Sequence, residues 1–306
     1  MQRALELVTS TAIGRVAHKA VSPFVRLLRR ISNPNIPNDH VITKVTYRGR
    51  TFNLEHRRWS PDDALVIKQC FAQGQYDMPS GAHGVLVDNL YRQIVASGLQ
   101  PLIIDCGANI GASVAWFSAR YPEAHIIAVE PAPENFALLR RNCAGGDVDM
   151  RQAGISSKDG RAYINTQRGG HMGFRTMHEP PGIEIDLISV SSLLASKPSS
   201  AYTPFLLKID IEGAEKNLFD GDTESINRFP LIIFEPHDWL IPGQLTSQEF
   251  FRFHAASGRE FCMKHENVAS IAAHGSLRTM AAGLKNESVT TALEPLTPAL
   301  IYHRQR

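Results

Sequence analysis

The stretch Leu102-Ile103-Ile104-Asp105-Cys106-Gly107-Ala108-Asn109-Ile110-Gly111 decides the fold. Its first four residues form an apolar run that ends on an acid, which is typical of a short, buried strand in a parallel sheet. A helical spacing of apolar residues follows at 112–120. A strand that enters a helix through a glycine turn predicts a ligand-binding loop, because open parallel sheets bind ligands at the carboxyl ends of their strands.

The same alternation of strands and helices continues along the chain. Further apolar strand patterns lie at 126–130, 148–155, 205–210, 231–235 and within 259–271, and helix patterns lie at 134–142, from about 214 and at 247–256. Nearly continuous apolar strands between helices predict an α/β fold of the Rossmann-like type. In such a fold a doubly wound, mostly parallel sheet carries helices on both faces.

Three segments are predicted along the chain. Residues 1–40 form a basic amphipathic N-terminal segment with a turn-rich linker, 41–100 an N-terminal α/β cap, and 101–306 the main domain. Residues 1–30 carry six Lys/Arg and one acid. Their helical spacing indicates either a helix resting on an anionic membrane surface or a helix packed on the domain.

Composition limits the classes of partner. A formal net charge of +2 argues against a dedicated nucleic-acid binder. The four cysteines form no CxxC pair, which indicates reduced thiols rather than disulfides or a zinc site. No apolar run approaches the roughly 20 residues that span a bilayer. We therefore expect a cytoplasmic protein, with peripheral contact at the inner face of a membrane as an alternative, that acts on a small molecule or glycan. An irregular stretch at 167–182 could cover its site.

The residues of the glycine loop predict what it binds. Asp105 offers a carboxylate to a cationic group, such as the amino group of a methionine moiety. Gly107 lets a ligand approach the backbone, and Gly111 lets the following helix pack close to the strand. Glu130 ends the next strand, where a carboxylate can accept both hydroxyl protons of a ribose.

Dinucleotide-binding domains share this pair of features. Here, however, the spacing is G-x-x-x-G, with Asn109 where a dinucleotide fingerprint has its middle glycine. The acid two residues before Gly107 would also repel a pyrophosphate, whereas it suits the positive sulfonium of S-adenosylmethionine. The alternatives are a nicotinamide-dependent oxidoreductase, a non-catalytic membrane-docked scaffold that keeps the fold, and a tight turn without any ligand.

A second set of polar residues follows the fourth and fifth predicted strands. They are Lys208, Asp210, Glu212, Glu215, Glu235 and His237. The carboxyl ends of these strands should face the crevice of the glycine loop. Asp210, Glu212 and His237 are the candidates for removing the proton of a hydroxyl that attacks a methyl group. Lys208, Glu215 and Glu235 are expected to support them or the substrate, with Lys208 pairing with Asp210 or with a neighbouring acid and keeping it ionised.

Simpler explanations exist for the same residues. His237 could be a capping or core histidine. The acids could be favourable charges at a helix N-terminus, which explains Glu215 better than the strand-terminal Asp210. Asp210, Glu212, Glu235 and His237 also offer hard oxygen ligands and one imidazole to a divalent metal. Their spacing fixes no metal geometry, so no metal is predicted.

Taken together, these motifs resemble the FkbM family of methyltransferases. The resemblance covers roughly residues 60–255 and rests on three ordered motifs: Ile104–Gly111, Ala128–Pro131 with Asn135 and Asn142, and Leu207–Glu215. It implies a class I methyltransferase fold that uses S-adenosylmethionine to methylate hydroxyls of sugars or natural-product precursors.

The resemblance also implies roles by position. Asp105, Gly107, Asn109 and Gly111, with Ala108 in the same loop, would hold the methionine end of the cofactor. Glu130 would hold the ribose, Gln152 and Ala153 would lie near the adenine, and Asp210 and Glu212 would lie at the reacting centre. One departure is Ser192-Leu193-Leu194, where the family commonly has a Thr-Leu-Asp-like segment, so any role of that aspartate is absent here.

Overall fold

The computed structural model describes residues 39–78, 81–165, 175–177, 182–221, 223–273 and 277. The predicted basic segment at 1–31 lies outside these residues. So does most of the irregular stretch at 167–182 that could cover a site.

A central sheet in the described part of the chain has seven strands in the order β12-β13-β11-β10-β3-β4-β5. Their bounds are β3 (Gln100–Cys106), β4 (His125–Val129), β5 (Val148–Arg151), β10 (Tyr202–Ile209), β11 (Leu231–Phe234), β12 (Glu260–Lys264) and β13 (Asn267–Ile271). Neighbouring strands from β5 to β11 are parallel, and the hairpin β12–β13 joins β11 antiparallel. The chain runs outward from β3 to β5 and returns on the other side at β10. This reversal is the point where α/β sheets bind their ligands.

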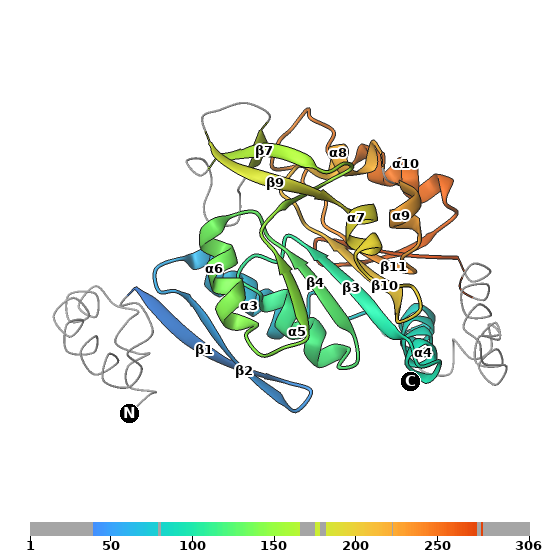
Figure 1. Ribbon diagram of the computed structural model, residues 1–306, viewed down its shortest axis with the longest axis horizontal. Helices are drawn as coiled ribbons and strands as arrows, with labels where there is room; N and C mark the ends of the chain where they lie inside the picture. The colour runs from blue at the N-terminus through green and yellow to red at the C-terminus, as the bar shows by residue number, and fades with distance from the viewer. Residues whose placement is uncertain are drawn as a thin grey trace.

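Helices cover both faces of this sheet (Figure 1). They are α3 (Pro61–Phe71), α4 (Ala82–Ala96), α5 (Ala112–Arg120), α6 (Pro133–Asn142), α7 (Val190–Ala195), α8 (Glu215–Phe219), α9 (Thr223–Asn227) and α10 (Gln248–Ala256). Alternate strand residues enter two separate cores: Ile103 and Ile126 lie in one, and Ile104 and Ile127 in the other. This alternation explains why the strands read as continuous apolar runs and confirms the predicted doubly wound fold.

No helix in the described ranges combines the length and the apolar character that crossing a bilayer requires.

The prediction of one strand at 148–155 was wrong. β5 ends at Arg151, opposite Val129, the last residue of its neighbour β4. Beyond this point the backbone would have no partner on the sheet. The chain instead forms β6 (Gly154–Ser156), which pairs with β9 (Ile183–Ser189) in a four-stranded sheet completed by β7 (Gly160–Asn165) and β8 (Arg175–Met177).

The N-terminal cap begins with a hairpin of β1 (His40–Tyr47) and β2 (Arg50–Arg57), which packs on the main domain. Leu54 of β2, Ile67 of α3 and Leu90 of α4 share one core with α5. The domain boundaries at 40 and 100 stay predictions.

Asn142, at the end of α6, joins the hairpin to the glycine loop. Its Oδ1 accepts from the backbone N–H of Glu55 at 2.7 Å, and its Nδ2 donates to the carbonyls of Glu55 at 2.9 Å and Ile110 at 2.7 Å. One side chain thus bonds to both segments through three backbone groups.

We expect Asn142→Ala to lower the free energy of unfolding by roughly 2–4 kcal/mol, because it leaves partly buried backbone groups without partners. Urea denaturation with an unchanged m-value would measure this loss. Asn53→Ala, at an exposed position of the same hairpin, is the matched control and should change stability by less than about 0.5 kcal/mol. Equal urea midpoints for Asn142→Ala and Asn53→Ala would contradict a stabilising role of the Asn142 hydrogen bonds.

Candidate functional site

A cleft lies where the strand order reverses, and it encloses about 600 Å³, counting the space open to solvent. Four segments line it: the loop after β3, the end of β4, the link from β5 to β6, and the loop after β10. The lining residues are Gly107, Asn109, Val129, Glu130, Pro131, Asn135, Ala153, Gly154, Ile155, Asp210, Ile211, Glu212 and Ala214. The sequence places the cleft correctly because a parallel sheet aligns its strand ends.

The glycine loop is built to bring β3 and β10 together. Gly107 has φ +83°, and a Cβ added there would lie 1.8 Å from the backbone oxygen of Asp210. No other residue type fits so close an approach. Gly111 has φ +89° and begins α5, where an added Cβ would meet Leu139 and Cys143 at 3.0 Å. Asn109 also takes a left-handed conformation, with φ +50°.

Glu130 fixes the loop from the neighbouring strand. One carboxylate oxygen accepts from the backbone N–H of Asn109 at 2.9 Å. The other accepts from the N–H of Ala132 at 2.9 Å and from Asn135 at 3.4 Å. Burial raises the pKa of Glu130 to about 7, although these N–H donors and the charge of Lys208 oppose the shift. Glu130 lines the cleft, and a carboxylate can accept more hydrogen bonds than these three.

Lys208 lies beneath the loop as a buried cation. Its Nζ donates to the carbonyl of Gly107 at 2.8 Å and lies 3.1 Å from Asp105 and 3.3 Å from Asp210. Burial alone would lower the pKa of Lys208, but the charges of Asp105 and Asp210 raise it well above its ordinary value. The ammonium therefore stays charged and joins both walls of the cleft.

The structure brings part of the predicted cofactor set to the cleft. Gly107, Asn109, Glu130 and Ala153 line it. Asp105, Ala108, Gly111 and Gln152 are not among its lining residues. Asp105 is fully buried and contacts Lys208, and it also accepts a hydrogen bond of 2.6 Å from Ser113. The roles of all these residues toward a ligand stay predictions.

A second cavity of about 430 Å³, again counting open space, adjoins the first. The two cavities share Gly107, Asn109, Asp210 and Glu212. The N-terminal cap supplies much of the remaining wall. Sequence reasoning missed these residues, which are Val66, Gln69, Gln75 and Tyr76. No local pattern signals them, because their position depends on how the cap packs on α5.

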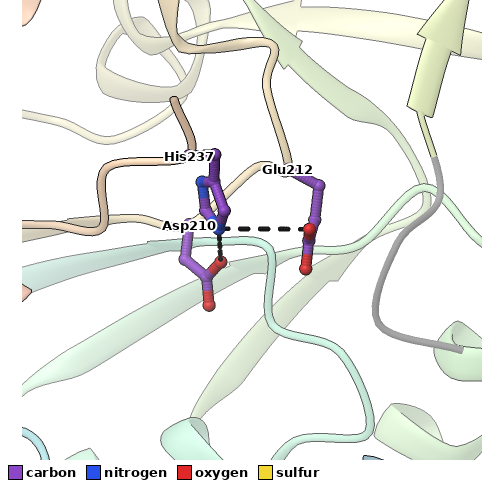
Figure 2. A group of neighbouring side chains, drawn as sticks. All are labelled: Asp210, Glu212 and His237. Atoms are coloured by element: carbon purple, nitrogen blue, oxygen red, sulfur yellow. Dashed lines mark ion pairs between the residues drawn. The ribbon is translucent and has the colours of Figure 1, made fainter. Parts of the chain in front are cut away.

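Of the predicted catalytic residues, Asp210 and Glu212 line both cavities, and His237, which lines neither, lies beside them. Figure 2 shows the imidazole of His237 facing the carboxylates of Asp210 and Glu212. Its Nε2 lies 3.6 Å from Asp210 Oδ1, 3.9 Å from Glu212 Oε2 and 3.6 Å from Glu235 Oε1. Its Nδ1 lies 2.6 Å from Glu215. His237 is 1% exposed, whereas the side chains of Asp210 and Glu212 are 25% and 22% exposed.

The cluster raises the pKa of Glu212, Glu235 and His237. Burial and the charge of Asp210 raise the pKa of Glu212 to about 8 and that of Glu235 to about 7. Burial alone would lower the pKa of His237, but the contacts with Glu215 and Glu235 and the charge of Asp210 raise it to about 11. Without a bound ligand His237 therefore holds its proton at neutral pH, and Glu212, with a pKa of about 8, also holds one. Each can act as a base only after it has lost that proton.

The backbone at Glu212 is strained. Glu212 has φ +55° and precedes Gly213 at φ +100°, where an added Cβ would lie 2.5 Å from Ile241. Strained backbone of this kind persists where the surroundings hold it in place, often at functional sites.

Comparison with known proteins agrees with this arrangement. Residues 105–258 match the family model described as the methyltransferase FkbM domain. Methyltransferase sdnD of Sordaria araneosa is 31% identical over 158 residues, which cover 40% of this chain and 61% of that protein. Hexuronic acid methyltransferase AglP of Haloferax volcanii is 28% identical over 144 residues, covering 46% of this chain and 58% of that protein. The chain thus matches about 60% of the length of these relatives.

Among solved structures, the O-methyltransferase TomG of Streptomyces achromogenes in complex with SAM gives a TM-score of 0.35 at 11% identity. The match covers 69% of this chain and 89% of that one.

Replacing Lys208 tests the buried cation. We expect Lys208→Met to lower the free energy of unfolding by about 3–5 kcal/mol, because Asp105 then becomes an uncompensated buried charge. The double variant Lys208→Met/Asp105→Asn should recover part of this loss. Lys216→Met, at an exposed position of α8, is the control. Thermal and urea unfolding would measure all three, and a neutral Lys208→Met would refute this account.

Proposed function

The chain belongs to the methyltransferase FkbM domain family, and from this we propose that it is an S-adenosylmethionine-dependent O-methyltransferase. The acceptor in this proposal is a hydroxyl of a sugar, a polysaccharide or a natural-product precursor. The observation that carries the proposal is that a cleft lined by the acid Glu130 adjoins a second cavity, and that the two share the carboxylates of Asp210 and Glu212.

The first cleft fits the cofactor in shape and in chemistry. Gly107 lines the cleft, and its missing Cβ lets the backbone of Asp210 lie close to the loop. Glu130 is anchored by two backbone N–H groups and still has lone pairs for ribose hydroxyls. Ala153, Gly154 and Ile155 offer a small, largely apolar wall suited to an adenine ring.

Asp105 has a different task in this proposal from the one expected of it. Its carboxylate is fully buried against Lys208 and Ser113. We infer that it positions the loop through Lys208, and that the methionine end of the cofactor lies along the backbone of Gly107 and Asn109.

The second cavity would hold the acceptor. When bound, S-adenosylmethionine supplies an electrophilic methyl group to an acceptor oxygen. Asp210 and Glu212 reach into both cavities and can take the proton of a hydroxyl placed between them. Gln69, Gln75 and Tyr76 offer hydrogen-bonding groups in the same cavity, as a polyhydroxylated acceptor requires. The name of the relative AglP, a hexuronic acid methyltransferase, supports a sugar acceptor.

Cofactor binding is tested by isothermal titration with S-adenosylhomocysteine. We expect Glu130→Ala to weaken binding by about 1–3 kcal/mol, because it removes the acceptor of the ribose hydroxyls. Glu224→Ala, an exposed acid on α9, should leave binding unchanged. Absence of binding up to about 1 mM in the wild-type chain would overturn the proposal. Thermal stabilisation by NAD in its place would favour an oxidoreductase.

The pH dependence of that binding follows from Glu130. Its ionised form accepts the ribose hydroxyls, and its pKa is raised to about 7. Affinity should therefore be highest above this pKa and be lost as the carboxylate is protonated. We expect Kd for S-adenosylhomocysteine to rise by roughly tenfold from about pH 8 to about pH 6. Glu130→Gln, which has no charge to lose, should bind weakly and show a flat profile.

Methyl transfer is tested by mass spectrometry of glycan and metabolite pools incubated with isotopically labelled S-adenosylmethionine. Asp210→Asn should slow transfer by about 10²–10⁴-fold, because it removes a proton acceptor. Binding of S-adenosylhomocysteine should stay close to that of the wild type. Equal transfer rates for Asp210→Asn and wild type would remove Asp210 from the catalytic set.

A further inference from the structure

The acids around His237 are arranged as ligands around a common centre. One atom each from Asp210, Glu212 and His237 lies within 4.8 Å of the other two. Ligands on opposite sides of a cation bound at about 2.1–2.4 Å stand roughly 4.2–4.8 Å apart. The three atoms are therefore spaced so that one divalent cation could contact all of them after small side-chain adjustments.

His237 is buried and aimed into this centre. Its Nδ1 lies 2.6 Å from Glu215 Oε1, which also accepts from the backbone N–H of Gly213 at 3.1 Å. Because this oxygen already accepts from Gly213, the proton that it shares with His237 lies on Nδ1. Nε2 faces the centre and binds a metal once the cation has displaced the proton that Nε2 holds without a ligand. At 3.6–3.9 Å from three carboxylates, Nε2 lies beyond hydrogen-bond length from each of them.

The other ligand residues are held from outside in the same way. Asp210 Oδ2 lies 3.3 Å from the Nζ of Lys208, and Asp210 Oδ1 faces His237. Glu235 accepts from Gln75 on Oε2 at 3.5 Å and turns Oε1 inward. Outer partners that orient the atoms facing a common centre are a hallmark of metal sites.

We propose that Asp210, Glu212 and His237, with Glu235 beside them, bind one divalent cation of the Mn²⁺ or Mg²⁺ class at the boundary of the two cavities. Carboxylate oxygens with one imidazole suit such an ion. Glu215 then acts as a positioning residue that orients the imidazole. The partial exposure of Asp210 and Glu212 leaves coordination positions open toward the cavities.

The consequence for catalysis rests on the proposed function. A cation at this boundary would bind the acceptor hydroxyl and lower the pKa of that hydroxyl. It would also relieve the repulsion among the clustered carboxylates. Ion binding itself does not require methyl transfer, so the two proposals can fail separately.

The test measures Mn²⁺ binding to the full chain after removal of metals with a chelator, using electron paramagnetic resonance of free Mn²⁺. We expect one Mn²⁺ per chain, displaced by excess Mg²⁺, with an imidazole nitrogen coupling in pulsed spectra. His237→Gln should abolish that coupling. Glu215→Gln should weaken binding by about 10–100-fold, as loss of an outer partner does. Asp186→Asn, an exposed acid on β9, is the matched control.

Glu212→Gln keeps the test decisive if His237→Gln fails to fold, since the Glu212 side chain is only partly buried. It should weaken Mn²⁺ binding by at least roughly tenfold. No stoichiometric Mn²⁺ binding by the wild-type chain, or equal binding by wild type, Glu212→Gln and Glu215→Gln, would overturn the proposal. Titration with S-adenosylhomocysteine in the absence of metal reports on the cofactor cleft alone. Mn²⁺ binding without S-adenosylhomocysteine binding would therefore contradict the proposed function and still support the cation site.

Discussion

The ammonium of Lys208 is the interaction on which the site depends. It lies between the carboxylate of Asp105 on β3, the carbonyl of Gly107 and the carboxylate of Asp210 after β10. A buried ion pair is costly to desolvate and persists only when its geometry is complete. The two sides of the cleft are therefore held in one relative position, which the contact between Gly107 and the backbone of Asp210 makes still tighter.

This arrangement divides the charged residues into two groups. Asp105 and Lys208 are almost fully buried and form an ion pair with each other. Asp210 and Glu212 keep part of their surface in the cavities, where a ligand can reach them. Asp210 belongs to both groups, because one of its oxygens faces Lys208 and the other faces His237. Through this residue the rigid interior of the loop is coupled to the chemistry of the cluster.

Sequence patterns predicted the parts of the fold that depend on local periodicity. The strands near 102, 126, 205 and 231 alternate between two cores, so their apolar runs carry a clear signal. The break between Arg151 and Gly154 carries no such signal, since it arises because β4 ends and leaves β5 without a partner. The meeting of Asp210, Glu212 and His237 followed from the aligned ends of parallel strands.

What the sequence could not predict is non-local. Gln75 and Tyr76 enter the second cavity only because the N-terminal cap packs on α5. Asp105 was expected to face the cofactor, since its spacing does not reveal that Lys208 lies beside it. Asn142 stood out as a family residue, but its bonds to Glu55 and Ile110 depend on the docked hairpin.

The hydrogen bonds of Asn142 also show that the stretch that matches the family model is not the whole of the packed unit. The family model matches residues 105–258, yet the loop within this stretch is tied through Asn142 to residue 55 and shares its core with Leu54 and Ile67. A protein cut to residues 105–258 would contain nearly all of the three motifs and still lack most of β3 and the whole hairpin β12–β13. The stretch that matches the family model is thus shorter than the unit that packs together, and protein made for biochemical work should contain the whole of that unit.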